Sequence, residues 1–128
     1  MSRDTSKLSP AMQKYAFDFM KACKDEKLDI VIICTDRNEA DQEAAFASGH
    51  SKAHFGQSAH NSVLANGNPA SEAFDIGVIR NGKYIGDDAD GSYSAAGAIG
   101  KSLGLVWAGD WKSFKELAHF QNPNWVKS

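Results

Sequence analysis

The fold of this chain is constrained most by a short apolar run from Leu28 to Cys34. Apart from Asp29, the run places apolar side chains at successive positions and is rich in β-branched residues, until Thr35-Asp36-Arg37-Asn38 breaks it. Such a run is typical of a strand with both faces buried, whereas a membrane-spanning helix needs about 20 mainly apolar residues. We therefore expect an internal strand with Arg37 at its end, and no insertion into a membrane.

Three segments have the pattern of helices. Ser9 and Pro10 suit the N-cap and first position of a helix, and apolar residues follow at spacings of three and four. A second helix is expected from Asn38 and closed by Gly49, and a third is made mainly of small residues. The expected helices span residues 10–27, 38–48 and 92–103.

Alternation and turn residues predict the remaining strands. Between Glu72 and Ile79, Phe74 belongs to an apolar face, and Asp75 points to the other side. Asn81-Gly82 is a strong hairpin signal. Further short strands are expected over residues 83–85, 105–107 and 117–121. Together these elements predict an α+β fold, in which about three helices pack against a small, mainly antiparallel sheet.

Composition excludes several classes of protein. The 128 residues suit one domain, so we expect a single domain over residues 1–128 with a flexible N-terminus at 1–8. Hydrophobic residues at 42% suffice for a core, and a net charge of −2 offers no basic surface for nucleic acid. Cys23 and Cys34 form no C-x-x-C motif and are expected to be buried. The polar first residues contain no secretory signal, which predicts synthesis in a cytoplasm.

His60 lies within a long segment without hydrophobic periodicity, residues 50–71, and such segments are usually functional or mobile. With Asp75 and His119 it offers two imidazoles and one carboxylate. Zinc accepts this ligand mixture, and a catalytic zinc keeps a fourth position open for water. The sequence therefore predicts one zinc ion per chain, held where the loops meet the ends of the sheet.

Glu116 is the candidate general base that would take a proton from the attacking water. Side chains alternate along a strand, so Glu116 and His119 would point to opposite faces if one regular strand held both. Residues 116–118 are therefore predicted to be irregular. Regular pairing through these residues would exclude Glu116 from the reaction.

Two other histidines and the tryptophans leave alternatives open. His50 and His54 are rival ligands that could share a helical face, but their loop lacks a helical apolar pattern, which favours solvated side chains. Trp107 is expected in the core, and Trp111 suits either the core or a substrate groove.

Four motifs occur in a characteristic order: Ser58-x-His60, Ala73-x-Asp75, Trp107-x-Gly109-Asp110-Trp111 and Glu116-x-x-His119-Phe120-Gln121. In order and register they resemble the zinc peptidoglycan peptidases, which include D-alanyl-D-alanine carboxypeptidases and phage L-alanyl-D-glutamate endopeptidases. The resemblance implies that His60, Asp75 and His119 bind the zinc. It also implies that Glu116 is the base.

The resemblance gives Arg37 a role as well, because the family has an arginine after the first core strand that assists the substrate carbonyl. A fixed guanidinium near the metal can also stabilise an oxyanion, so we expect Arg37 to be catalytic. Gln42, on the following helix, matches the family too. We expect Gln42, Ser58 and Trp111 to contact substrate, although Ser58 could equally order its own loop.

This chain departs from the common family pattern at two places. Asp75 follows His60 after a longer stretch than is frequent in the family, and we expect the extra loop, Val63 to Pro69, to bulge outward without moving either ligand. The base position holds Glu116 where phage relatives often have aspartate. The carboxylate is retained, so catalysis remains the expectation.

The expected function is hydrolysis of a peptide bond in bacterial peptidoglycan by a phage or prophage endolysin with L-alanyl-D-glutamate endopeptidase activity. One alternative is a D,D-carboxypeptidase that releases terminal D-alanine, and another is a binding module that keeps zinc without turnover. The expected partner is a peptidoglycan stem peptide bound by a monomer. By analogy, the protein would be made in the host cytoplasm and act on the wall after release.

Overall fold

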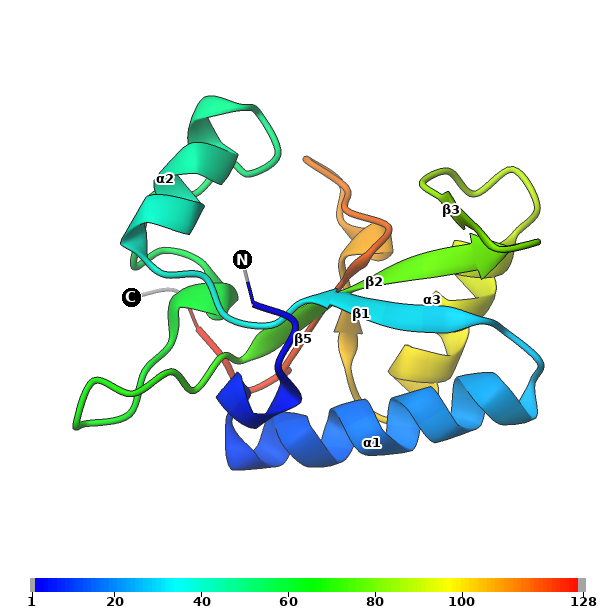
Figure 1. Ribbon diagram of the computed structural model, residues 1–128, viewed down its shortest axis with the longest axis horizontal. Coiled ribbons are helices and arrows are strands. Elements are labelled where there is room, and N and C mark those ends of the chain that lie inside the picture. Colours follow the sequence, from blue (N-terminus) through cyan, green and yellow to red (C-terminus); the bar gives the residue numbers. More distant parts are fainter. Residues whose placement is uncertain (1, 127–128) are drawn as a thin grey trace.

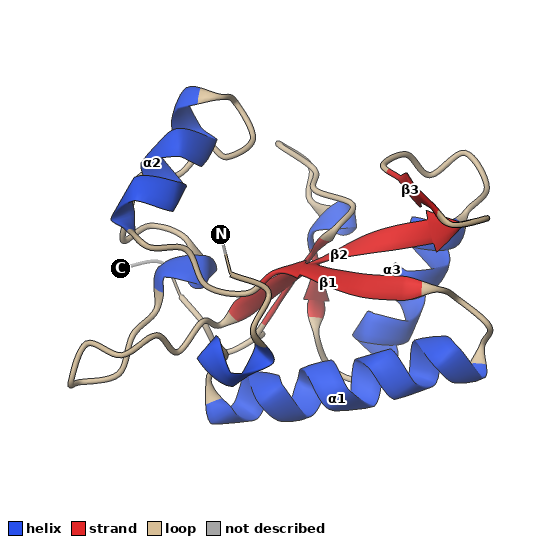
Figure 2. Cartoon of the chain, viewed as in Figure 1, coloured by secondary structure: helices blue, strands red, loops and turns tan. Residues whose placement is uncertain are grey.

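A computed structural model describes residues 2–126 and contains three α-helices and one five-stranded sheet. The helices are α1 (Pro10–Asp25), α2 (Glu39–Ala47) and α3 (Ser92–Ser102). The strands are β1 (Ile30–Cys34), β2 (Ala73–Arg80), β3 (Lys83–Ile85), β4 (Val106–Trp107) and β5 (His119–Gln121). Single turns of 3-10 helix occur at η1 (Thr5–Lys7), η2 (Ala59–Asn61) and η3 (Ala108–Asp110). The predicted α+β class is confirmed (Figure 2).

Helix α1 begins as the sequence predicts and ends earlier. Ser9 caps it by accepting a hydrogen bond from the backbone N–H of Met12 at 3.2 Å, and Pro10 occupies the first turn. The helix stops at Asp25 because Lys27 adopts a left-handed backbone conformation, with φ of 60°, that turns the chain into β1. No helix among the described residues is long and apolar enough to cross a membrane.

Strand β2 is the centre of the sheet. It pairs antiparallel with β1 on one side and with β3 and β5 on the other, and β4 continues the sheet beyond β5. The expectation that residues 28–34 form an internal strand is wrong, because β1 pairs with β2 alone within residues 2–126. Its apolar run instead packs Ile30 and Cys34 inward and leaves Val31 36% exposed.

The two faces of β2 have different roles. Phe74, Ile76 and Val78 are buried against α1 and α3, which cover this face of the sheet (Figure 1). Asp75 lies on the opposite face, as alternation predicts. Helix α2 stands apart from the other helices, beyond the end of β1 (Figure 1). The segment from β1 through α2 to η2 therefore surrounds the polar end of the sheet.

Helix α3 packs closely against β4 and β5 because two of its residues lack side chains. A Cβ atom on Gly97 would lie 2.4 Å from the Trp107 ring, and one on Gly100 would lie 2.5 Å from the Phe120 ring. Real Cβ atoms do not approach other heavy atoms so closely. The predicted core position of Trp107 is confirmed, with 8% of the residue exposed.

The N-terminal segment and the extra loop are both held by backbone contacts. Residues 1–8 were expected to be flexible, but Leu8 is buried and the Ser2 carbonyl accepts a hydrogen bond from the Thr35 N–H at 2.7 Å. The loop at 63–69 is closed by a bridge between Val63 and Pro69 and projects outward, as the green loop of Figure 1 shows. Because the extra residues of this loop project outward, they do not displace η2.

Candidate metal centre

Three different elements deliver the predicted zinc ligands. His60 lies in η2, where Ser58 accepts a hydrogen bond from the His60 N–H at 3.2 Å and Asn61 completes a capping box. Asp75 lies in β2, and His119 is the first residue of β5, directly opposite Asp75 in the antiparallel register. Cross-strand pairing therefore fixes two of the ligands, and a capped turn fixes the third.

Both imidazoles contact the same carboxylate oxygen. His60 Nε2 lies 3.1 Å from Asp75 Oδ1, and His119 Nδ1 lies 3.0 Å from that oxygen. A tetrahedral zinc with bonds of about 2.0–2.1 Å places its ligand atoms about 3.3 Å apart, close to these two separations. All three residues are buried, so a charge between them would be poorly screened by water. The residue types and their convergence fit zinc.

The outer nitrogen of each ring has its own acceptor. His60 Nδ1 donates to the Thr35 carbonyl at 2.6 Å, and His119 Nε2 donates to Gln121 Oε1 at 2.7 Å. Histidine ligands of metals usually donate their second N–H to such an oxygen, which fixes the ring and its tautomer. His60 Nε2 and His119 Nδ1 therefore face Asp75 and are the ring nitrogens available to bind a metal.

Charges within the cluster shift its pKa values. Burial alone raises the pKa of Asp75, but the charge of His60 and the hydrogen bond from His119 outweigh it and hold this pKa well below 3.8. Burial alone lowers the pKa of His119, but its hydrogen bond and attraction to Asp75 raise this pKa above 6.5. The carboxylate is therefore ionised and ready to bind a cation.

Arg37 contacts the Asp75 carboxylate, and Gln42 contacts Arg37. Arg37 Nη2 donates to Asp75 Oδ2 at 3.2 Å, and Arg37 Nη1 lies 3.4 Å from Gln42 Oε1. Gln42 is fully buried, and its amide N–H groups donate to Ser51 Oγ and the Ala53 carbonyl. The Gln42 side chain thus faces the protein interior, which differs from the substrate contact expected of it.

Arg37 is also more enclosed than the sequence suggests. The residue is 7% exposed, and its Nε is a buried donor without a partner among the described residues. Asn61, which was not among the predicted site residues, donates to the Arg37 carbonyl and to Gln42 Oε1, both at 3.2 Å. Only its place in a capping box could have drawn attention to Asn61.

Glu116 stands in an irregular segment immediately before β5. Residues 117 and 118 form a turn and regular pairing starts at His119, so the predicted irregularity at 116–118 is confirmed. The Glu116 side chain lines the cleft beside His119. Burial raises the pKa of Glu116 above 4.5, and the negative charge of Asp75 acts in the same direction. Glu116 is therefore a better proton acceptor than an exposed glutamate.

The cluster opens into a cleft with a volume of about 480 Å³. Trp111 forms part of its wall, with its ring centroid 5.5 Å from that of His119. Lys52 and Lys112 also line it, and the Lys52 ammonium lies 5.4 Å from the centroid of the Phe114 ring. Ser58 lines the cleft as well as capping η2, so both roles considered for it agree with its position.

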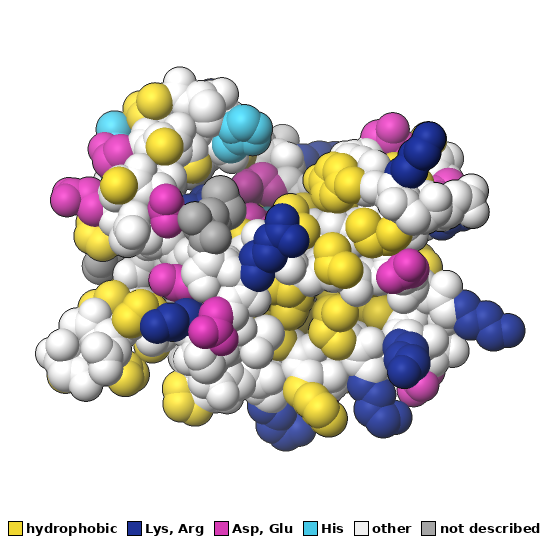
Figure 3. Space-filling model, in the orientation of Figure 1, with side chains coloured by type: hydrophobic (Ala, Val, Ile, Leu, Met, Phe, Trp, Pro, Cys, Tyr) yellow, Lys and Arg dark blue, Asp and Glu magenta, His cyan; other side chains and the backbone are white. Residues whose placement is uncertain are grey.

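A second, larger groove of about 920 Å³ lies between α1 and β1. Hydrophobic side chains gather over these two elements in Figure 3, and Phe17 and Met20 are among the lining residues. None of the predicted site residues lines this groove. The chemistry of the lining residues, and not volume, therefore locates the candidate site.

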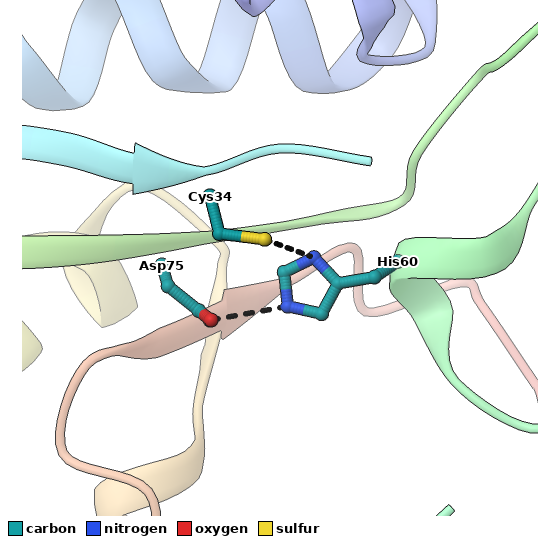
Figure 4. Close-up of side chains that lie close together, drawn as sticks. All are labelled: Cys34, His60 and Asp75. Atoms are coloured by element: carbon teal, nitrogen blue, oxygen red, sulfur yellow. Dashed lines mark hydrogen bonds and ion pairs between the residues drawn. The ribbon is translucent and has the colours of Figure 1, made fainter. Parts of the chain in front are cut away.

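Cys34 offers a different ligand set. Cys34, His60 and Asp75 have ligand atoms within 4.8 Å of one another, and Figure 4 shows Cys34 and Asp75 at opposite nitrogens of the His60 ring. The Cys34 sulfur lies 3.8 Å from His60 Nδ1, the nitrogen that already donates to Thr35. Burial raises the pKa of the Cys34 thiol to about 12, which disfavours the thiolate needed for metal binding. The raised pKa of the thiol therefore argues against Cys34 as a ligand.

Comparisons with known proteins identify a family and two similar proteins. A family model described as D-alanyl-D-alanine carboxypeptidase matches residues 4–122. The chain is 29% identical over 124 residues to the peptidoglycan L-alanyl-D-glutamate endopeptidase CwlK of Bacillus subtilis, covering 91% of this chain and 74% of the relative. The crystal structure of the L-Ala D-Glu endopeptidase ChiX of Serratia marcescens superposes with a TM-score of 0.72 at 16% identity, covering 92% of this chain and 82% of ChiX.

Proposed function

This chain belongs to the D-alanyl-D-alanine carboxypeptidase family, and from that premise we propose that it is a zinc peptidase that cleaves L-alanyl-D-glutamate bonds in peptidoglycan. The observation that carries the proposal is the convergence of His60 and His119 on one oxygen of Asp75, at a cleft that Glu116 also lines. The activity named for the CwlK relative supports the choice of bond.

His60 Nε2, an Asp75 oxygen and His119 Nδ1 would hold the zinc. When bound there, zinc would supply a Lewis acid that polarises the scissile carbonyl and activates a water molecule. Thr35 and Gln121 orient the two rings through their outer nitrogens, and Arg37 orients Asp75 through its second oxygen. The ligands are thus fixed before any metal arrives, which reduces the ordering cost of binding.

Glu116 moves the proton in this reaction. Its carboxylate accepts the proton of the attacking water, and the protonated acid then donates it to the amine that leaves. The raised pKa of Glu116 serves both steps, because it strengthens the base and keeps the acid from losing its proton prematurely. The irregular backbone at 116–118 lets its side chain share the cleft with His119.

Arg37 has a positioning role in this proposal, in addition to the oxyanion role expected from the sequence. Its guanidinium is paired with Asp75 and largely withdrawn from solvent. Gln42 and Asn61 act through Arg37, because their amides fix its side chain and its backbone. Trp111 and Ser58, which line the open part of the cleft, are the residues assigned to substrate contact.

The charges of the cleft suit an anionic substrate. Lys52 and Lys112 line it, whereas Arg37 is already engaged by Asp75. In a stem peptide the D-glutamate continues through its side chain, so a free carboxylate lies beside the scissile nitrogen. A terminal D-alanine presents the same group, which explains how one kind of cleft serves both activities. The bond cleaved must therefore be identified from products.

Mass spectrometry of digested peptidoglycan tests the proposal. Wild-type protein should release fragments with a new N-terminal D-glutamyl residue, and a chelator or Glu116→Gln should prevent their release. Free D-alanine as the product would support the D,D-carboxypeptidase instead. Zinc binding without any fragments would support a non-catalytic binding module and refute the proposal.

The resemblance of the four motifs to phage endopeptidases supports an endolysin role for this enzyme. Co-expression with a membrane pore should then lyse bacteria, and Glu116→Gln should abolish lysis. A monomer should be active, because His60, Asp75, His119 and Glu116 all come from one chain; sedimentation at working concentration measures the oligomeric state of the active protein. Survival of cells that express both wild-type enzyme and pore would contradict the lytic role.

A further inference from the structure

The two histidines of the metal centre face Asp75 through different nitrogens. His60 uses Nε2 and donates from Nδ1, whereas His119 uses Nδ1 and donates from Nε2. The acceptor for His60 is a main-chain carbonyl of Thr35, which no substitution removes. The acceptor for His119 is the side chain of Gln121, which the sequence could have replaced by many other residues.

We propose that Gln121 is a positioning residue that fixes the ring of His119 so that Nδ1 is its metal-binding nitrogen. The inference rests on the proposed function, because it takes His119 as a zinc ligand. Gln121 follows two residues after His119 in β5, so both side chains project from the same face of the strand. Its Oε1 lies 2.7 Å from His119 Nε2, within the range of a good hydrogen bond.

The chemistry of the pair explains why an acceptor is needed here. A neutral imidazole has one N–H and one lone pair, so a partner that accepts at Nε2 leaves the lone pair at Nδ1. Asp75 cannot define this choice when zinc is present, since its contact with Nδ1 is the one that a metal replaces. The bond to Gln121 is on the far side of the ring and persists.

Gln121 also controls the ring's rotation. Trp111 packs near the His119 ring, with centroids 5.5 Å apart, but an aromatic neighbour does not distinguish one ring nitrogen from the other. The hydrogen bond does so because it is directional. Loss of such an outer partner typically lowers metal affinity about 10–100-fold.

Zinc affinity of substituted proteins tests the proposal, measured by competition with a chromophoric chelator. Gln121→Met keeps the length of the side chain and removes the acceptor, and Gln121→Ala is a second variant without it. Both should bind zinc about 10–100-fold more weakly than wild type. Gln121→Glu retains an acceptor and should stay within about threefold of wild type or bind more tightly.

A control and a spectroscopic measurement separate positioning from general damage. Gln57→Met removes an amide from the same cleft without touching His119, and its zinc affinity should match wild type. In zinc-loaded wild type, the Nε2 proton of His119 should give a slowly exchanging NMR signal that Gln121→Met loses and Gln121→Glu keeps. Cooperative thermal unfolding without metal should be retained by all of these variants, which shows that each of them folds.

Two results would overturn the proposal in distinguishable ways. If His119→Ala abolishes zinc binding while both Gln121→Met and Gln121→Ala bind as tightly as wild type, Gln121 has no positioning role and the proposed function stands. If His119→Ala retains wild-type zinc affinity, the ligand set of the proposed function is wrong, and the role of Gln121 falls with it.

Discussion

The chain contains two pairs of histidines, and their surroundings differ in almost every respect. His60 and His119 are 1% and 5% exposed at their side chains and share one oxygen of Asp75. His50 and His54 lie at the surface near α2, where Ser48 contacts His50 and Glu43 contacts His54. The His54 side chain is 56% exposed.

The difference shows that closeness along the chain is a poor guide to a metal site. His50 and His54 are neighbours in sequence, but each has its own partner and no common acceptor. His60 and His119 are far apart in sequence, yet the register of β2 and β5 and the capped turn of η2 bring them to one carboxylate. A shared, buried acceptor is therefore the property that distinguishes the two proposed ligands from the two solvated histidines.

Zinc content should separate the two pairs most sharply. His119→Ala removes a proposed ligand and should abolish both stoichiometric zinc binding and hydrolysis, whereas His54→Ala should leave one zinc per chain and activity within about twofold of wild type. Inductively coupled plasma mass spectrometry of dialysed protein measures the content. Zinc lost from the His54 variant and kept in the His119 variant would reverse the assignment.

A glutamate lies beside one histidine of each pair: Glu116 beside His119 and Glu43 beside His54. The two glutamates permit a matched test of Glu116 as the general base. Glu116→Gln should lower turnover about 10²–10⁴-fold with zinc content unchanged, because it removes only proton transfer. Glu43→Gln, beside His54, should leave turnover unchanged. Initial rates of peptidoglycan hydrolysis by zinc-saturated proteins give the comparison. Equal rates for wild type and Glu116→Gln would remove Glu116 from the mechanism.

The stability of the folded protein should fall with rising pH when no metal is bound, and the stabilisation by zinc should increase with rising pH. The raised pKa of His119 contributes stability to the metal-free protein that is fully present below about pH 6.5 and is lost as the pH rises through the raised pKa. Zinc needs the neutral ring, so its stabilising effect grows over the same range. As the pH rises, the melting temperature of the metal-free protein should fall by a few °C, and the increase in melting temperature caused by zinc should grow by a few °C.

His119→Gln is the control for this pH effect, since it should flatten the pH dependence of the metal-free melting temperature. His54→Gln should preserve that dependence. The ionisation of Asp75 adds a constant contribution over this range, because its lowered pKa lies far below it. A metal-free melting temperature that rises between pH 6.5 and 8.5 in wild type would contradict the hydrogen bond described between His119 and Asp75.

The smallest effect is expected at Cys34, which contacts His60 and is not among the proposed ligands. Cys34→Ser should leave zinc affinity within about threefold, because the sulfur contacts the nitrogen of His60 that Thr35 already holds. Chelator competition measures the affinity. A loss as large as that of His119→Ala would show that the metal binds on the Cys34 side of the ring.

Local patterns in the sequence predicted most of the fold. The caps and apolar spacing located α1, and alternation placed Phe74 and Asp75 on opposite faces of β2. Position within the sheet was not predictable, because an apolar strand such as β1 has the same pattern whether its second neighbour is another strand or a helix. The end of α1 depends on the backbone of Lys27, which composition does not reveal.

The types of residue in the candidate site were predictable, and their contacts were less so. Strand alternation alone required the irregular backbone at Glu116. The burial of Arg37 and Gln42 was not predictable, since it arises from a network that joins the loop after β1 to α2 and η2 only after folding. Gln121 is the last residue of the Glu116-x-x-His119-Phe120-Gln121 motif, but its hydrogen bond to His119 is visible only in three dimensions.

The close packing of α3 has a consequence for engineering this protein. Replacement of helical glycines by alanine is a standard route to greater heat resistance. Here an added methyl group at Gly100 would collide with Phe120, the residue next to His119 in β5. Helix α3 contributes no group to the proposed reaction, yet a larger residue at Gly100 would displace the strand that carries His119. Attempts to stabilise the protein should therefore leave the glycines of α3 unchanged.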